Sequence, residues 1–311
     1  MSGAVAYDSM TMKRSADPEA VLAEVNHDQG TSFALAGVLS GGFQGGAWRI
    51  VGPDGDTSVL KWREDDGAWH RVVLAATAKV AAARRHGYPT PSWVAAGVTA
   101  HGFVYQIQEL VAGCPAEYLT EPLARQLVDV LDRSTAGNRP EPADDPRSDW
   151  SQFVLCEMSA GAGGLPSRVS ALGSQEAAVV ERALAVLDRY GPTRLSADDL
   201  VHGDLNLSNV LITSDGSLAG IIDIEALGAG SRAIDYATLW HSSADAGDAE
   251  ALRLVRAAGQ RAAGPAGFAT CAVWIALEYI RFGADLDGAT GSARAAAAAH
   301  RRLDSLEVPL P

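Results

Sequence analysis

Strand-type residue patterns occupy the first third of the chain, and helical patterns fill most of the rest. Three apolar runs, "FALAGVLSG", "GAWRIVG" and "TSVLKWR", are separated by "GGFQGG" and by "PDGD". Connections that are rich in Gly or contain Asp-Gly are typical of β-hairpins. A helix over about residues 67–86 follows, and "WVAAGVTAHGFVYQIQEL" then predicts two more strands joined by a turn near His101. Residues 33–110 therefore predict a five-stranded, largely antiparallel sheet that carries one helix.

The chain after Pro115 has few strand signals. The spacing of its apolar residues predicts helices over about 115–134, 149–160, 174–190 and 232–308, with one β-like island at 209–224. A polar, Pro-rich loop at 135–149 separates the first two of these helices. Near the start of the chain, Asp17 and Pro18 suit an N-cap and a first helical position, so "PEAVLAEVN" predicts a short helix.

These patterns together predict an α+β fold with two lobes. The small lobe is an antiparallel sheet with one main helix, and the larger lobe is mostly α-helical. The predicted boundaries are a disordered tail at 1–16, a first lobe at 17–111 and a second lobe at 112–311.

Charge and cysteine content restrict the partners of the chain. Its 25 Lys and Arg against 38 Asp and Glu give a net charge of −13, which disfavours nucleic acid and anionic lipid and favours a cationic small molecule. The alternative is that the excess acid only aids solubility. The three cysteines form no CxxC pair, and neither a signal peptide nor an apolar run long enough to span a membrane is recognised. We therefore expect a cytoplasmic protein with no membrane partner.

The stretch "VHGDLNLSNVLI" places His202, Asp204 and Asn209 on one polar loop. The carboxylate of Asp204 can accept a proton from an attacking hydroxyl, and the amide oxygen of Asn209 can bind a metal ion. A later apolar run ends at Asp223, whose carboxylate can bridge that ion to phosphate. These hard oxygen ligands are the ones that Mg²⁺ prefers. The alternative is a polar turn, which explains neither the spacing nor the later Asp.

Two features of the first lobe suit phosphate binding. The hairpin "SGGFQGG" is rich in Gly, so its backbone N–H groups can lie close to a ligand. Lys61 lies within the apolar strand "VLKW", about fifteen residues further on, where an ammonium could hold phosphate oxygens. Each feature has a common alternative, which is a flexible hairpin tip for the glycines and a solvent-facing strand position for the lysine.

The segment "VHGDLNLSN…IIDIE" resembles the catalytic segment of the aminoglycoside phosphotransferase and choline kinase family, small-molecule kinases with a protein-kinase-like bilobal fold. The resemblance covers residues from about 33 to 285. It implies that Asp204 is the catalytic base, that Asn209 and Asp223 are Mg²⁺ ligands and that Lys61 binds phosphate.

The same resemblance implies a nucleotide site and two bracing residues. In "QELVAG", the hinge between the lobes, the carbonyl of Glu109 and the N–H of Val111 would hydrogen-bond adenine. His202 would brace the catalytic loop, and Asp235 would steady it from the next helix. The nucleotide is expected to be ATP, with GTP possible, and the glycine-rich hairpin would cover its phosphates through Gly41, Gly42, Phe43, Gln44 and Gly45.

Protein-kinase activity is disfavoured by three differences from the protein-kinase pattern. The loop reads His-Gly-Asp in place of His-Arg-Asp, "IDIE" replaces Asp-Phe-Gly, and no Ala-Pro-Glu follows.

One departure from kinases concerns the partner of Lys61. Kinases of this fold pair the strand Lys with a Glu on the next helix. The position expected for that Glu is Ala76, and the helix at 67–86 carries no acid. The preceding acids Glu64, Asp65 and Asp66 are possible substitutes, and the alternative is that phosphate and Asp223 alone hold the lysine.

The acceptor pocket is expected in the second lobe, beside the catalytic Asp. Trp274 and Glu278 are four residues apart and so share a helix face, which suits a bulky cation. The alternative is that Trp274 packs in the core and that Glu278 pairs with Arg281. The candidate lining residues are Asp149, Trp150, Glu157, Glu225, Trp274 and Glu278.

The sequence thus predicts an ATP- and Mg²⁺-dependent O-phosphotransferase for a cationic small molecule, such as an aminoglycoside or a basic peptide antibiotic of the viomycin type. Two alternatives remain at this point. One is a metabolic kinase for choline, a sugar or homoserine, and the other is a nucleotide-binding protein without turnover.

Overall fold

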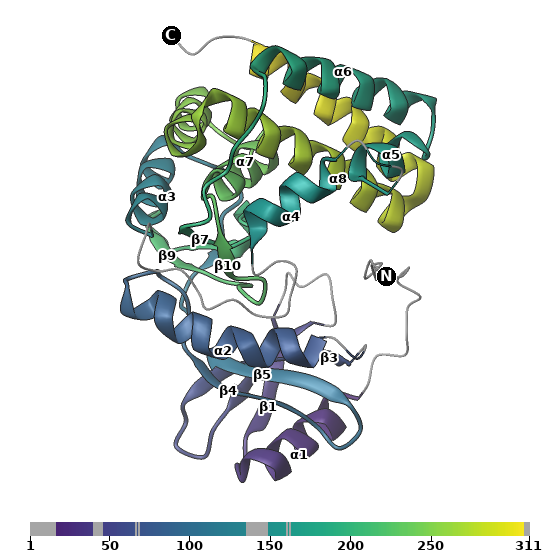
Figure 1. Ribbon diagram of the computed structural model, residues 1–311. Helices are drawn as coiled ribbons and strands as arrows, with labels where there is room; N and C mark the ends of the chain where they lie inside the picture. The colour runs from purple at the N-terminus through teal and green to yellow at the C-terminus, as the bar shows by residue number, and fades with distance from the viewer. Residues whose placement is uncertain are drawn as a thin grey trace.

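The first lobe is a five-stranded antiparallel sheet with two helices (Figure 1). The computed structural model describes residues 17–39, 46–65, 67, 69–134, 149–159, 161 and 163–307. The strand order is β1-β2-β3-β5-β4, which confirms the predicted sheet. The elements of this lobe are α1 (Pro18–Gln29), β1 (Ala34–Leu39), β2 (Ala47–Val51), β3 (Thr57–Glu64), α2 (Trp69–Arg85), β4 (Trp93–Val98) and β5 (Phe103–Glu109).

Alternation along β3 and β5 gives the sheet two different faces. On one face, Leu60 and Trp62 of β3 and Ile107 of β5 are buried against α1 in a small apolar core. The opposite face carries Lys61, whose register partner across the sheet is Gln106. Helix α2 packs on β4 and β5 and lies between the sheet and the second lobe (Figure 1). Lys61 and Gln106 are thus held on the face away from α1.

The second lobe is mainly helical, as predicted. Its helices are α3 (Glu121–Arg133), α4 (Trp150–Glu157), α5 (Leu165–Ser170), α6 (Ser174–Tyr190), α7 (Ala233–Ser242) and α8 (Ala249–Glu307). Short strands accompany them, namely β6 (Cys114–Pro115), β7 (Asp199–Val201), β8 (Val210–Ile212), β9 (Leu218–Ile221) and β10 (Gly228–Gly230). Strand β8 pairs with β6 and β9, and β7 pairs with β10.

Two sequence predictions for this lobe were wrong in detail, and one helix was not predicted. The helix predicted from residue 115 begins at Glu121, because Cys114–Pro115 pairs with β8 and Thr120 accepts a capping hydrogen bond from the Leu123 N–H. The β-like island is not alone, since β7 and β10 lie outside it. Helix α5 was not predicted, because its six residues are too few to show a helical period.

The C-terminal helical region, α8, is broken at two glycines. Gly264 and Gly288 have φ of 71° and 58°, and Pro265 restarts the helix after the first break. By length and composition, α8 alone among the described elements could span a membrane, with a mean hydropathy of 1.2 over its most apolar stretch. However, 67% of that stretch is buried, and α8 packs against α3, α6 and α7. It therefore forms the core of this lobe.

The main apolar core extends from the second lobe into the end of α2, where Val80 and Ala83 contribute to it. The sheet ends at Glu109 and the first helix of the second lobe begins at Glu121. We therefore retain 17–111 and 112–311 as proposed lobe boundaries, while the predicted tail at 1–16 lies outside the described residues.

His241 of α7 gives the fold a testable pH dependence. Its ring is buried against Tyr279, with centroids 4.7 Å apart, and burial followed by the nearby Arg302 cation lowers its pKa to about 4. The unfolded chain, with a His pKa of about 6.5, binds this proton first as the pH falls. Stability from this group is therefore complete above pH 6.5 and is lost towards pH 4, by about 3 kcal/mol.

Urea unfolding at pH 7.5 and pH 4.5 measures this effect. We expect His241→Gln to lose about 2–3 kcal/mol less unfolding free energy between these two pH values than the unsubstituted protein does. Equal losses in the two proteins would contradict the assignment.

Candidate active site

A buried carboxylate fixes the start of the catalytic loop. Asp235 of α7 accepts hydrogen bonds from the backbone N–H groups of His202 (2.8 Å) and Gly203 (2.9 Å) through its two oxygens. The side chain is fully buried, and this burial raises its pKa to about 6 in spite of the two N–H donors. The loop that follows β7 is thereby attached to α7.

The His202 ring connects this loop to the strand that precedes Asp223. Its Nε2 lies 2.9 Å from the carbonyl oxygen of Ile222, and its Nδ1 lies 3.2 Å from the backbone N of Asp204. The carbonyl can only accept and the backbone N–H can only donate, so the ring is the neutral Nε2–H tautomer. Both ring nitrogens are engaged, which agrees with the proposed bracing role.

The Asp204 carboxylate is oriented by two side-chain amides. Asn206 Nδ2 donates to Asp204 Oδ1 (2.9 Å), and Asn209 Nδ2 donates to Asp204 Oδ2 (3.3 Å) and to the Asp204 carbonyl (2.9 Å). Burial raises the pKa of Asp204, against the lowering effect of these two amides, and the nearby Asp223 carboxylate adds to the rise. The sequence analysis missed Asn206, although an Asn two residues after the Asp was a visible signal.

Asp223 lies beside Asn209 and is held in an uncommon backbone conformation. The Ile222 N–H donates to the Asn209 carbonyl (2.9 Å), and Asp223 is the one non-Gly residue with positive φ (66°) in the described part of the chain. Such strain is concentrated at functional sites. Burial acts to raise the pKa of Asp223, but the Lys61 ammonium, 2.7 Å from Oδ1, and a hydrogen bond with Glu225 together outweigh it and lower the pKa to about 2. Asp223 is therefore charged at neutral pH.

Lys61 has a second carboxylate partner that the sequence analysis assigned elsewhere. Glu225, a candidate acceptor residue, lies 3.4 Å from Lys61 Nζ and also accepts a hydrogen bond from Gln106 Nε2. Burial acts to lower the pKa of Lys61, but Glu225 and Asp223 together raise it. Burial also raises the pKa of Glu225, against the effect of Lys61.

The substitutes considered for the missing helix Glu do not take that place. Helix α2 has no acid, and Ala76 is buried. Asp65 bonds the His70 ring (2.8 Å) at the start of the helix. Glu64 is exposed and, three residues after Lys61 on the same strand, faces the other side of the sheet. Asp66 lies outside the described residues.

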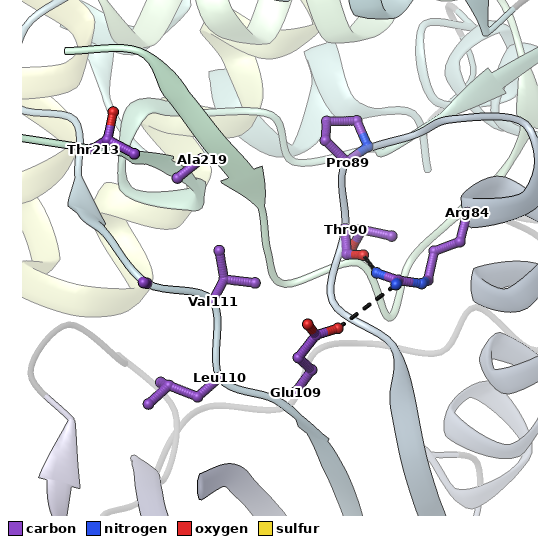
Figure 2. Close-up of a pocket in the computed structure, with 9 residues that line it drawn as sticks. Arg84, Pro89, Thr90, Glu109, Leu110, Val111, Thr213 and Ala219 are labelled. Carbon is purple, nitrogen blue, oxygen red and sulfur yellow. Dashed lines mark hydrogen bonds and ion pairs between the residues drawn. The ribbon is translucent and has the colours of Figure 1, made fainter. Parts of the chain in front are cut away.

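A pocket of about 380 Å³ lies beside the segment that joins the lobes (Figure 2). Glu109, Val111 and Ala219 are among its lining residues. The Glu109 side chain bonds the Ser92 hydroxyl (2.9 Å) and pairs with Arg84 (3.6 Å), so its carboxylate is engaged within the protein. Adenine binding by Glu109 and Val111 remains a proposal that this pocket supports. The predicted phosphate-covering residues from Gly41 to Gly45 lie outside the described residues.

The acidic acceptor candidates have partners within the protein. Glu157 pairs with Arg168, and Glu278 lies 2.8 Å from Arg281. Asp149 caps the N-terminus of α4 through its side chain. The pairing of Glu278 with Arg281 is the alternative that the sequence analysis considered. The roles of these residues in acceptor binding remain predictions.

The aromatic acceptor candidates are buried below the catalytic loop. Trp150 and Trp274 are each 4% exposed, and their ring centroids are 6.1 Å apart. Phe153 packs edge-on against both rings. Trp150 Nε1 also donates to the Ala226 carbonyl (2.9 Å), and its ring lies directly against Gly203. In the described structure these rings support the loop from the core side.

The donor set fits one magnesium ion. Asn209 uses its Nδ2 on Asp204, and no donor in the described part of the chain reaches its Oδ1. That oxygen and the charged carboxylate of Asp223 would be the protein ligands. The described residues hold no group of three or more His, Cys, Asp or Glu suited to a metal. Phosphate and water would thus complete the coordination, as is usual for Mg²⁺.

Residues 37–274 of the chain match the Phosphotransferase enzyme family. The chain belongs to this family. No match to the sequence was found among curated proteins. The protein is thus a small-molecule kinase, as the sequence predicted.

Solved structures with the same protein-kinase-like fold are also phosphotransferases. A thermostable mutant of aminoglycoside phosphotransferase APH(4)-Ia, in ternary complex with ADP and hygromycin B, is 16% identical with a TM-score of 0.63, over 92% of this chain and 98% of that chain. The GDP complex of aminoglycoside 2'-phosphotransferase-IIIa is 15% identical with a TM-score of 0.63, over 92% and 98%. A type I macrolide 2'-phosphotransferase is 20% identical with a TM-score of 0.59, over 93% and 98%. At these identities the likeness confirms the fold.

The contact between Gly203 and Trp150 yields a prediction with a matched control. Gly203 has φ of +85°, and a Cβ there would lie 2.1 Å from Cζ2 of Trp150, whereas Gly216 has φ of +82° and nothing within 4 Å. Alanine at either position should cost about 1 kcal/mol for the left-handed backbone. Gly203→Ala should cost about 1–3 kcal/mol more, because the buried ring must move.

Urea unfolding of the two variants measures this difference, and their phosphotransfer rates show whether the loop has moved. Equal stability of Gly203→Ala and Gly216→Ala would show that the ring does not restrain the loop.

Proposed function

We propose that the protein is an ATP- and Mg²⁺-dependent O-phosphotransferase that phosphorylates a hydroxyl of a cationic small molecule. The observation that carries this proposal is the orientation of Asp204 by Asn206 and Asn209, next to the Lys61–Asp223 pair. The loop after β7 and the neighbouring strands thus bring together a general base, a phosphate-binding cation and two hard oxygen ligands. These are the groups that phosphoryl transfer requires.

In the proposed reaction, Asp204 accepts the proton of the acceptor hydroxyl as its oxygen bonds to the γ-phosphorus of ATP. The bond between that phosphorus and the bridging oxygen breaks, and ADP leaves with the electron pair. Lys61 holds phosphate oxygens, and His202 keeps Asp204 and Asp223 in a fixed relation through its two ring contacts. Mg²⁺ bound to Asn209 and Asp223 would neutralise phosphate charge.

The net charge of −13 favours a cationic acceptor, since a negative potential attracts cations over long distances. An aminoglycoside or a viomycin-type peptide antibiotic has this character. Two solved structures of the same fold support the choice, because one contains hygromycin B and another is a macrolide phosphotransferase. We also propose a cytoplasmic location, with which the three free cysteines agree.

A panel assay tests the acceptor and the base together. ADP release is measured with ATP and Mg²⁺ over aminoglycosides, viomycin-type peptides, macrolides, choline, sugars and homoserine. We expect a cationic antibiotic to stimulate turnover, and Asp204→Asn to lower kcat at least ~10²-fold because the base is lost. Asp304→Asn, an exposed acid paired with Arg182, is the matched control and should retain turnover.

Each other outcome of the panel has a definite meaning. Stimulation by choline, a sugar or homoserine alone would favour the metabolic kinase. No stimulation by any compound, with nucleotide still bound, would favour a binding protein without turnover. Turnover of Asp204→Asn close to the original rate would remove the assignment of the base.

Substitution of Asn206 or Asn209 distinguishes metal binding from orientation of the Asp204 carboxylate. Both donate to Asp204, but Asn206 Oδ1 already accepts from Ser208 N (3.0 Å), while Asn209 Oδ1 is left for the ion. Asn209→Ala should therefore raise the Mg²⁺ concentration for half-maximal rate about 10–100-fold. Asn206→Ala should lower kcat with that concentration unchanged. Equal Mg²⁺ dependence of the two variants would contradict Asn209 as a ligand.

A further inference from the structure

We propose that Glu225 is the positioning residue for Lys61, in place of the acid that α2 lacks. The proposal rests on the proposed function, because Lys61 is taken to be the phosphate-binding cation. Glu225 would hold the ammonium in place, and Lys61 would make the contact with the nucleotide.

Lys61 needs a carboxylate partner other than Asp223. Lys61 Nζ lies 2.7 Å from Asp223 and 3.4 Å from Glu225. If Asp223 binds a metal ion, its oxygens are directed to that ion and its charge is shared with it. A lysine side chain that is only 22% exposed and has no other carboxylate would then be left without compensation until phosphate binds, which is costly. Glu225 can remain with Lys61 while Asp223 turns to the metal.

Glu225 is held in position by a residue of the sheet. Its side chain is 10% exposed and accepts a hydrogen bond from Gln106 Nε2. Gln106 is 3% exposed and lies opposite Lys61 in the antiparallel register of β3 and β5. Side chains of such a pair lie on the same face. Gln106, Glu225 and Lys61 therefore form one hydrogen-bonded group across the interlobe boundary.

The segment after Glu225 is held by hydrogen bonds from residues of both lobes. Lys79 of α2 donates to the Leu227 carbonyl (3.0 Å), and Trp150 of α4 donates to the Ala226 carbonyl (2.9 Å). Lys79 lies three residues after Ala76, and so about one turn further along α2. Helix α2 thus binds the segment that carries Glu225, although α2 itself supplies no acid. Under this proposal, Lys61 has a carboxylate partner although α2 carries Ala76 and no acid.

A double-mutant cycle on nucleotide affinity tests the proposal. The affinity for AMP-PNP with Mg²⁺ is measured by calorimetry in the absence of acceptor. We expect Glu225→Gln to weaken binding at least ~10-fold, because a charge-assisted contact to Lys61 is lost. In a Lys61→Met background the same change should alter affinity less than ~2-fold, since Glu225 then has no cation to place. Glu250→Gln, an exposed acid paired with Arg253, is the matched control and should bind normally.

Three results would overturn the proposal. A loss that is equally large in the Lys61→Met background would show that Glu225 acts independently of the lysine. A raised Mg²⁺ requirement in Glu225→Gln at unchanged nucleotide affinity would make it a metal ligand. A changed KM for the acceptor at unchanged AMP-PNP affinity would show that Glu225 acts in the acceptor pocket.

A second variant covers the case in which Glu225→Gln does not fold, as judged by its thermal unfolding. Gln106→Leu removes the donor that fixes Glu225 and should weaken AMP-PNP binding in the same direction, whereas unchanged affinity would contradict the proposal. Because these measurements use no acceptor, the double-mutant cycle can still be interpreted if the proposed function is wrong. A protein that binds AMP-PNP with the expected coupling but phosphorylates nothing would refute only the proposed function.

Discussion

The site depends on one buried carboxylate that accepts two backbone N–H groups. Asp235 fixes the peptides of His202 and Gly203, and the His202 ring then reaches the backbone of Asp204 and of Ile222. A fully buried acid is costly, and its pKa of about 6 reflects that cost. The N–H donors offset part of it. The helix α7 thereby determines the positions of both the catalytic loop and the strand end that carries the second Asp.

A second set of contacts joins this loop system to the sheet lobe. Lys61 of β3 meets Asp223 and Glu225, and Gln106 of β5 meets Glu225 from the neighbouring strand. The side chains of Lys61, Glu225 and Gln106 are largely withdrawn from water, so the Lys61–Glu225 pair is less screened than a surface ion pair, whereas Asp223 is about half exposed. The position of the Lys61 ammonium therefore depends on how the two lobes are placed relative to each other. Under the proposal made above, Glu225 takes over the electrostatic role of the acid that α2 lacks.

The sequence was most informative where the pattern is local. The two-lobe fold and the five-stranded sheet were predicted from apolar periodicity and Gly-rich connections, and the polar loop from one contiguous motif. The pairing of Lys61 with Glu225 was not predictable in this way, because the two residues are separated by 164 positions. Their contact depends on how the lobes meet. The start of α3 at Glu121 was missed for the same reason, since Cys114–Pro115 pairs with a strand almost a hundred residues later.

Three acids of the second lobe, including two acceptor candidates, are paired with arginine at short range. Glu157 faces Arg168, and Arg281 lies between Glu278 and Asp285 at 2.8 and 2.7 Å. Attraction of a distant cation depends on the summed charge, whereas a direct contact needs an oxygen that is free of an arginine. Two carboxylates around Arg281 leave one negative charge uncompensated. For the proposed cationic acceptor, this group would therefore be a more favourable point of contact than the one-to-one pair of Glu157 and Arg168.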